Sequence, residues 1–418
     1  MKILLYGINF APELTGTGKY SGEMAQWLAN NGHVVDVVTA PPYYPQWRVA
    51  PGFSAWKFER TAMADTDERV QILRCPLWVP SKVTSLTRLL HLASFALSSS
   101  LGLLWGLSRK PDLVFVVVPT LLQVPHAFVL SRLAGVPNWL HVQDFEVDAA
   151  LDMGLVAGGA GRGGFLRRSA WWFESFWMRR FDRVSTITPS MVKRLIVKGV
   201  EQDKVVELPN WVSLDGIFPI SRADSMRAEL GIGDDQIVVL YSGNMGEKQG
   251  LDMVVDAAAR LDGHPSIRFV LAGTGAARKR LQRAAAHLRN ITWLPLQPIE
   301  KLNALLGSAD IHILPQRADA ADLVMPSKLT GMLASGRAIV GTAAADTQLG
   351  DVLDKVGVRV APENLDELVQ ALTALADDPQ RRHELGLRGR RHAEETLDQH
   401  VILRRFIQEV ASVKEVLV

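Results

Sequence analysis

Short apolar runs rich in valine, isoleucine and leucine recur along this 418-residue chain, separated by longer stretches with helical spacing. Such runs are typical of parallel strands that helices bury on both faces. The first half contains KILLYGI, VVDVVTA, VQILRCPL, LVFVVVP, NWLHVQDF and RVSTITP, and the second contains IVVLYSG, IRFVLAG, ITWLPL, IHILP, RAIVGT and VGVRVA. Because the pattern occurs twice, the sequence predicts an α/β chain with two doubly wound parallel-sheet domains.

The break between the two sets falls at LPNWVSLDGIFPIS, which is rich in turn formers and lacks helical spacing. The sequence therefore predicts a Rossmann-like domain over residues 1–207, a hinge over 208–221 and a second Rossmann-like domain over 222–399, with a final helix over 400–418. Open parallel sheets bind ligands beyond the carboxyl ends of their strands, so we expect the domains to face a shared cleft there.

The amino-acid composition narrows the class of protein further. The chain is 48% hydrophobic and 22% charged with a net charge of +2, as in an ordinary globular protein. Its one cysteine, Cys75, excludes an internal disulfide, and MKILLYGINFAPE is better explained as a first strand than as a signal peptide. We therefore expect a cytoplasmic protein.

Residues 160–200 hold nine arginines and lysines, interleaved with tryptophan and phenylalanine between positions 171 and 177. A basic, aromatic-rich segment suits an anionic membrane surface, here the inner face of the cell membrane. A solvated basic face over buried aromatics explains the pattern equally well. No nucleic-acid motif accompanies it, so we expect no nucleic-acid partner. Residues 89–107 carry no formal charge, but serines, glycines and His91 favour a packed or interfacial helix over a membrane span.

Two glycine-containing loops of the second half follow predicted strands. SGNMGEKQGLD contributes Gly243, Asn244 and Lys248, and VMPSKLTGMLASGRAIVG contributes Ser327 and Lys328 at a predicted helix start. Backbone amides at a helix start and a lysine charge both favour anions. Two such loops imply a ligand with a diphosphate.

Further glycines mark the ends of other predicted strands. Gly273 and Gly275 follow IRFVLA, and Gly16 and Gly18 open the first helix, where a backbone without Cβ atoms admits a ligand closely. The spacing after Gly18 departs from G-x-G-x-x-G, which disfavours a dinucleotide enzyme.

Polar residues also end the strand NWLHV. Asp144 is the favoured catalytic centre, with His141 or Glu146 assisting, because charged groups at a strand's carboxyl end suit an active site. The alternative for Asp144 is a helix cap. A D-x-D match at Asp65–Asp67 lies in a predicted polar loop, so we expect no metal site there.

Together these motifs resemble the retaining nucleotide-sugar glycosyltransferases of the two-domain GT-B type, family 4, in particular bacterial colanic-acid and exopolysaccharide enzymes. The resemblance rests on FAPELTGTGKYSGEMAQWLANNGHVVDVVTA, HVQDFEVD, LPNWVSLDGIFP and the two loops above, and spans roughly residues 1–400. It implies a nucleotide-sugar donor held by the second domain and an undecaprenyl-diphosphate-linked sugar as acceptor. It also implies that the last helix packs back on the first domain.

The chain departs from the wider family at two places. Asn244 stands where an arginine is common, and Leu323 and Gly331 stand where many members carry two glutamates. Asp322 is the candidate replacement for gripping the ribose. The resemblance favours a GDP-sugar such as GDP-fucose, with UDP-sugars open, and no cofactor or metal. The alternatives are a nucleotide-sugar 2-epimerase of the same fold and a non-catalytic nucleotide-sugar or glycan-binding partner.

Overall fold

The computed structural model describes the chain except residues 14–15, 119–120, 146–161, 318–324 and 418, and the side chains of 162–167, 248 and 413–417. The chain divides into two compact units. Unit 1 comprises residues 1–209 and 403–418, and unit 2 comprises residues 210–402. Each has its own sheet, and we describe each by itself.

Unit 1 is built on an eight-stranded sheet in the order β3-β4-β2-β1-β5-β6-β7-β8. All neighbouring pairs are parallel except β3 with β4. The strands are β1 (Lys2–Tyr6), β2 (Val34–Thr39), β3 (Glu59–Ala62), β4 (Val70–Arg74), β5 (Leu113–Val118), β6 (Asn138–Val142), β7 (Arg183–Thr186) and β8 (Val205–Glu207). The six runs expected from the sequence are all strands, whereas β3 and β8 were missed.

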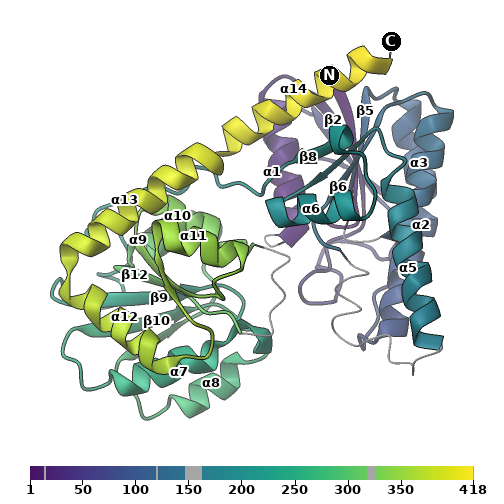
Figure 1. Ribbon diagram of the computed structural model, residues 1–418. Helices are drawn as coiled ribbons and strands as arrows, with labels where there is room; N and C mark the ends of the chain where they lie inside the picture. The colour runs from purple at the N-terminus through teal and green to yellow at the C-terminus, as the bar shows by residue number, and fades with distance from the viewer. Residues whose placement is uncertain (14–15, 119–120, 146–161, 318–324, 418) are drawn as a thin grey trace. The chain divides into compact units, whose positions relative to one another are not determined.

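Helices cover both faces of this sheet (Figure 1). The helices of this half are α1 (Gly16–Asn30), α2 (Ser85–Ser108), α3 (Val124–Leu133), α5 (Arg162–Met178) and α6 (Pro189–Val197). Alternate strand residues such as Val114, Val116 and Leu140 pack with α2, α3 and α6 in one core. On the opposite face, Phe406 contacts Phe115 with ring centroids 5.0 Å apart. Phe406 belongs to the last helix, α14 (Gln399–Leu417), whose residues from 403 onward pack in unit 1.

Unit 2 is built on a six-stranded parallel sheet in the order β11-β10-β9-β12-β13-β14. Its strands are β9 (Ile237–Ser242), β10 (Ile267–Ala272), β11 (Ile291–Leu294), β12 (Ile311–Leu314), β13 (Ala338–Thr342) and β14 (Val358–Val360). Its helices are α7 (Leu251–Arg260), α8 (Arg278–Ala284), α9 (Leu302–Gly307), α10 (Lys328–Ala334), α11 (Gln348–Val356), α12 (Leu365–Asp377) and α13 (Pro379–Thr396).

The apolar strands of unit 2 bury both faces, as their continuous Val/Ile/Leu runs predict. Val239 and Phe269 pack under α7, α8 and α12, and their neighbours Val238 and Val270 pack under α9, α10 and α11. The predicted fold class, two doubly wound parallel-sheet domains, is thereby confirmed.

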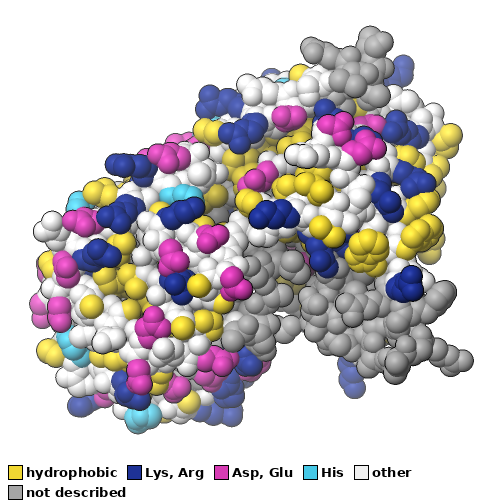
Figure 2. Space-filling model, viewed as in Figure 1, with side chains coloured by type: hydrophobic (Ala, Val, Ile, Leu, Met, Phe, Trp, Pro, Cys, Tyr) yellow, Lys and Arg dark blue, Asp and Glu magenta, His cyan; other side chains and the backbone are white. Residues whose placement is uncertain are grey.

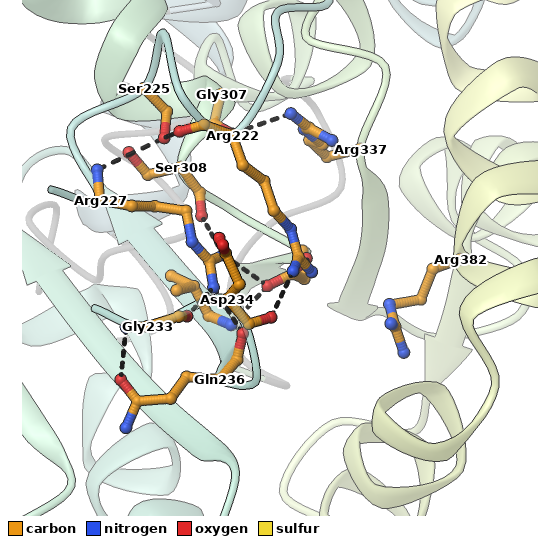
Figure 3. Close-up of polar contacts among 12 residues, drawn as sticks. Arg222, Ser225, Arg227, Gly233, Asp234, Gln236, Gly307, Ser308, Arg337 and Arg382 are labelled. Atoms are coloured by element: carbon orange, nitrogen blue, oxygen red, sulfur yellow. Dashed lines mark hydrogen bonds and ion pairs between the residues drawn. The ribbon is translucent and has the colours of Figure 1, made fainter.

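An ion cluster fixes the start of unit 2 to its sheet (Figure 3). Asp310, just before β12, is buried and accepts hydrogen bonds from Arg222 Nη2 at 2.5 Å, Arg227 Nη1 at 2.9 Å and Val238 N at 2.8 Å. Burial alone would raise the pKa of Asp310, but these hydrogen bonds outweigh it and lower the pKa below its usual value. The cluster therefore ties residues 222–227 to the amino end of β12.

Candidate functional site

Lys328 lies at the centre of the candidate donor site in unit 2. It is the first residue of α10, and its Nζ donates to Tyr241 Oη at 2.8 Å and to Gln249 Oε1 at 2.9 Å. Nζ also lies 4.4 Å from the centroid of the Tyr241 ring. Burial lowers the pKa of Lys328 to about 8, because the charged ammonium loses solvation there. The site thus holds a cation that titrates just above neutral pH.

Tyr241 connects this lysine to the glycine loop that follows β9. Its hydroxyl donates to the backbone oxygen of Asn244 at 2.5 Å while it accepts from Lys328. Burial raises the pKa of Tyr241, so the hydroxyl stays a donor. Tyr241 was not among the expected site residues, although it is the penultimate residue of β9 and its hydroxyl lies near the carboxyl end of that strand.

The glycine loops that follow β9 and β10 lie against each other. Gly273 and Gly275 have φ values of +147° and +153°. A Cβ on Gly273 would lie 1.8 Å from Gly243 O, and one on Gly275 would lie 2.4 Å from Met245 O. Met245 N donates to Thr274 O at 2.7 Å, which joins the loops directly. These glycines are therefore required for loop packing, besides the close ligand approach expected from the sequence.

Four other residues were expected to bind the donor: Ser327, Asn244, Lys248 and Asp322. Ser327 is exposed and makes no side-chain cap, and α10 has only seven residues, so attraction for an anion depends on Lys328 more than on the helix end. Asn244 is exposed on its loop. The backbone of Lys248 lies in a 3-10 turn, Glu247–Gln249, while its side chain is outside the described residues, as is all of Asp322.

Arg317 brings a second positive charge to this loop region, which the sequence analysis did not predict. The Cγ of Arg317 lies 3.5 Å from where a Cβ on Gly250 would be, and Gly250 begins α7 with φ +66°. Arg317 and Arg280 both contribute to holding the pKa of Asp252, in the first turn of α7, below its usual value, with the hydrogen bond from Arg280 as the main cause. Arg317 therefore adds a positive charge near the start of α7, where Arg280 already pairs with Asp252 and Glu247.

The expected glycines of unit 1 flank a buried carboxylate. Gly16 starts α1 with φ +61°, and a Cβ on Gly18 would lie 2.6 Å from Glu13 Oε2. Glu13 accepts from Tyr43 N and Tyr44 N at 3.0 Å each, and burial raises its pKa. Glu13 thereby joins the loop after β1 to the loop after β2, a positioning part that was also missed.

His141 and Asp144 lie at the carboxyl end of β6 in unit 1. His141 is buried, with Nδ1 2.8 Å from Ser185 Oγ and Nε2 2.8 Å from Gln143 Nε2, and burial lowers its pKa to about 3. A neutral ring hydrogen-bonded at both nitrogens favours positioning of Gln143 over proton transfer. Asp144 is half-buried two residues beyond the strand, and Glu146 is outside the described residues.

The described residues contain no group of three or more His, Cys, Asp or Glu side chains arranged to hold a metal ion. Asp65 and Asp67 lie in the turn between β3 and β4, both with positive φ. In chemical terms, unit 2 offers a lysine and two close-packed loops to an anionic ligand, and unit 1 offers a carboxylate at a strand end.

Both halves of the chain match families of known proteins. Residues 15–211 match the Glycosyl transferase 4-like domain, and residues 223–392 match Glycosyl transferases group 1. The chain is 44% identical over 417 residues to an Escherichia coli K12 protein named for colanic acid biosynthesis, the glycosyl transferase WcaI, covering 98% of this chain and 100% of that one. The chain belongs to this family of glycosyltransferases.

Other relatives are more distant. A D-inositol 3-phosphate glycosyltransferase of Nocardia farcinica is 28% identical over 228 residues, covering 51% of this chain and 49% of that protein. Among solved structures, sucrose-phosphate synthase of Thermosynechococcus elongatus matches with TM-score 0.75 and 16% identity, covering 99% of this glycosyltransferase and 98% of that chain. Anabaena HepE, in complex with UDP-glucose, matches with TM-score 0.69 and 14% identity, covering 99% and 100%. These structures share the GT-B fold.

Proposed function

We propose that this glycosyltransferase moves a sugar, with retention, from a nucleotide-diphosphate sugar to a lipid-linked sugar during synthesis of a colanic-acid-type exopolysaccharide. The observation that carries the proposal is Lys328, held by Tyr241 and Gln249 beside the paired glycine loops of unit 2. A partly buried lysine beside the backbone amides of a glycine loop is suited to binding a diphosphate. The relative named for colanic acid biosynthesis supports the pathway.

In the proposed reaction, the bond between the sugar's anomeric carbon and the donor β-phosphate oxygen breaks, and a bond to the acceptor hydroxyl oxygen forms. The leaving group is a nucleoside diphosphate, whose developing charge Lys328, Lys248, Ser327 and loop amides would stabilise. This preorganised electrostatic effect is the largest single contribution to catalysis in many enzymes.

The acceptor proton would pass to the departing β-phosphate oxygen in a front-face reaction. Asp144, with His141 as a positioning group, would orient the acceptor hydroxyl from unit 1. A double displacement with Asp144 or Glu146 as nucleophile is the alternative, and trapping a glycosylated carboxylate would favour it. Closure of the two units about residues 208–221 would exclude water and align the reactants.

The donor is proposed to be a GDP-sugar, with GDP-fucose favoured by the family resemblance and UDP-sugars as the alternative. Asp322 is proposed to bind the ribose in place of the missing glutamates. The acceptor is proposed to be an undecaprenyl-diphosphate-linked sugar, which would bring the enzyme to the inner face of the cell membrane, with the basic aromatic segment 160–200 at the lipid. Metal independence is proposed because the D-x-D match at Asp65–Asp67 lies in the turn between β3 and β4 and not at the end of an apolar strand.

Incubation with labelled GDP- and UDP-sugars, membrane lipid extract and EDTA tests this function. Label in the lipid fraction, with release of nucleoside diphosphate, is expected. A nucleotide sugar changed only at its 2-carbon would identify an epimerase. Tight donor binding without turnover would identify a binding protein, and either outcome would contradict transfer.

A further inference from the structure

Helix α2 presents an unpartnered row of leucines to solvent. Leu86, Leu90, Leu97, Leu101 and Leu104 are between 49% and 77% exposed. At 100° per residue they lie within about 60° of one another around the helix axis, and the row is about 27 Å long. Single exposed leucines are common, but five on one side of a helix over this length mark an interaction surface.

The opposite side of α2 is fixed to the sheet of unit 1. A Cβ on Gly102 would lie 2.6 Å from Cys75 Sγ, and a Cβ on Gly106 would lie 2.5 Å from Leu4 Cδ1, so the helix packs unusually close to the strands. Ser99, also on this side, lies 2.7 Å from Tyr6 Oη. By length and composition alone α2 could cross a membrane, but 44% of its most apolar window is buried. Its geometry suits a helix that lies along a surface.

Helices α3 and α5 also expose apolar side chains. On α3, which contacts α2, Val129 is 44% exposed and Leu133 is 80% exposed. On α5, Trp172 is 56% exposed. Figure 2 shows hydrophobic and basic side chains together along the flank of unit 1 where Figure 1 places α2 and α3. Tryptophan and leucine among basic residues are typical of interfacial segments.

The charged residues around the leucine row indicate which kind of partner this surface binds. The sequences of α2, α3, α5 and α6 contain a single acidic residue, Glu174, and it is buried against Lys198. Exposed basic residues lie on or next to these helices: Lys82, Arg88, Lys110, Arg132, Arg168, Arg179 and Arg180. The nearby Asp182 is mostly buried and is bound by Arg132 at 2.7 Å. A second copy of the chain would bring the same positive charge against this face, which disfavours a symmetric dimer.

We propose that the leucine row of α2, with the exposed apolar residues of α3 and α5, docks this glycosyltransferase on an anionic phospholipid surface. The leucines enter the boundary between headgroups and acyl chains, and the surrounding arginines and lysines contact lipid phosphates. This inference rests on the proposed lipid-linked acceptor for its purpose, and it adds the leucine row of α2 and the exposed residues of α3 to the basic segment 160–200, which contains α5.

Vesicle flotation of the full chain tests the proposal. Phosphatidylcholine vesicles with and without an equal share of phosphatidylglycerol are compared at low and high salt. The wild type is expected to float with the anionic vesicles, and more weakly at high salt. In Leu97→Gln/Leu101→Gln the partition coefficient is expected to fall at least about tenfold, because two exposed leucines no longer leave water.

The matched control is Leu296→Gln/Leu387→Gln, which changes leucines of 51% and 54% exposure in unit 2 and should bind as the wild type does. Equal melting temperatures show that both variants fold. Equal flotation of wild type and the α2 variant would overturn the proposal. So would a wild-type dimer that the α2 variant dissociates without any vesicle binding. Nucleoside diphosphate titration without lipid reports the donor site separately, so a failed transfer reaction leaves the docking result interpretable.

Discussion

The lowered pKa of Lys328 predicts that binding of a nucleoside diphosphate weakens as pH rises. Burial lowers this pKa from 10.5 to about 8, so the free protein loses the positive charge as pH rises through 8. A bound diphosphate favours the charged ammonium, and binding above pH 8 therefore requires uptake of a proton. The association constant should fall about tenfold between pH 7 and pH 9, whereas a lysine with an ordinary pKa would give almost no change.

Calorimetric titration with UDP and GDP over this pH range measures the effect. Lys328→Arg keeps the charge at every pH, so its affinity should stay nearly constant from pH 7 to pH 9. Because this variant meets the same ligand, it also corrects for ionisation of the nucleotide. The reasoning is refuted if wild-type affinity is constant over the range, or if Lys328→Arg shows the same decline.

Three further predictions concern the surroundings of the site. Tyr241→Phe should weaken nucleoside diphosphate binding about tenfold or more, since Lys328 loses a hydrogen-bond acceptor. The control variant Tyr6→Phe in unit 1 should leave this binding unchanged. Equal effects of the two variants in calorimetry would contradict a local role of Tyr241. Asp310→Asn should lower the free energy of unfolding by about 3–5 kcal/mol, because Arg222 and Arg227 lose their carboxylate partner. Because the pKa of Asp310 is lowered, wild-type stability should fall as pH drops through that pKa, and denaturant titrations should show less acid sensitivity in the variant. Gly273→Ala should reduce both melting temperature and nucleotide binding, whereas Gly263→Ala, with nothing within 4 Å of the new Cβ, should change neither.

The strands were predictable because burial on both faces leaves continuous apolar runs such as IVVLY, which becomes β9. Strand β3 was missed because it has no such apolar run. It is an antiparallel edge strand whose residues Arg60 to Ala62 are exposed, and ERTA has no apolar pattern. Strand β8 has only three residues and none is fully buried.

The site was predictable in part. A lysine after a strand and loop is visible in a sequence, and Lys328 was predicted in this way. Its partner Tyr241 is 87 positions earlier, and nothing local marks that pairing. Glu13 was missed because its role depends on backbone amides 30 and 31 residues away. Gly273 was assigned to ligand approach, while its packing against Gly243 O requires knowledge of strand order.

The most direct test of the central claim is nucleoside diphosphate release by wild type and Lys328→Met, measured with donor, lipid acceptor and EDTA. Our account predicts one nucleoside diphosphate for each sugar that enters the lipid fraction. It also predicts a loss of about a hundredfold or more in kcat/KM for Lys328→Met, the scale expected when a charge-stabilising group is removed. Turnover of Lys328→Met at the wild-type rate, or release of nucleoside monophosphate with sugar phosphate, would contradict it.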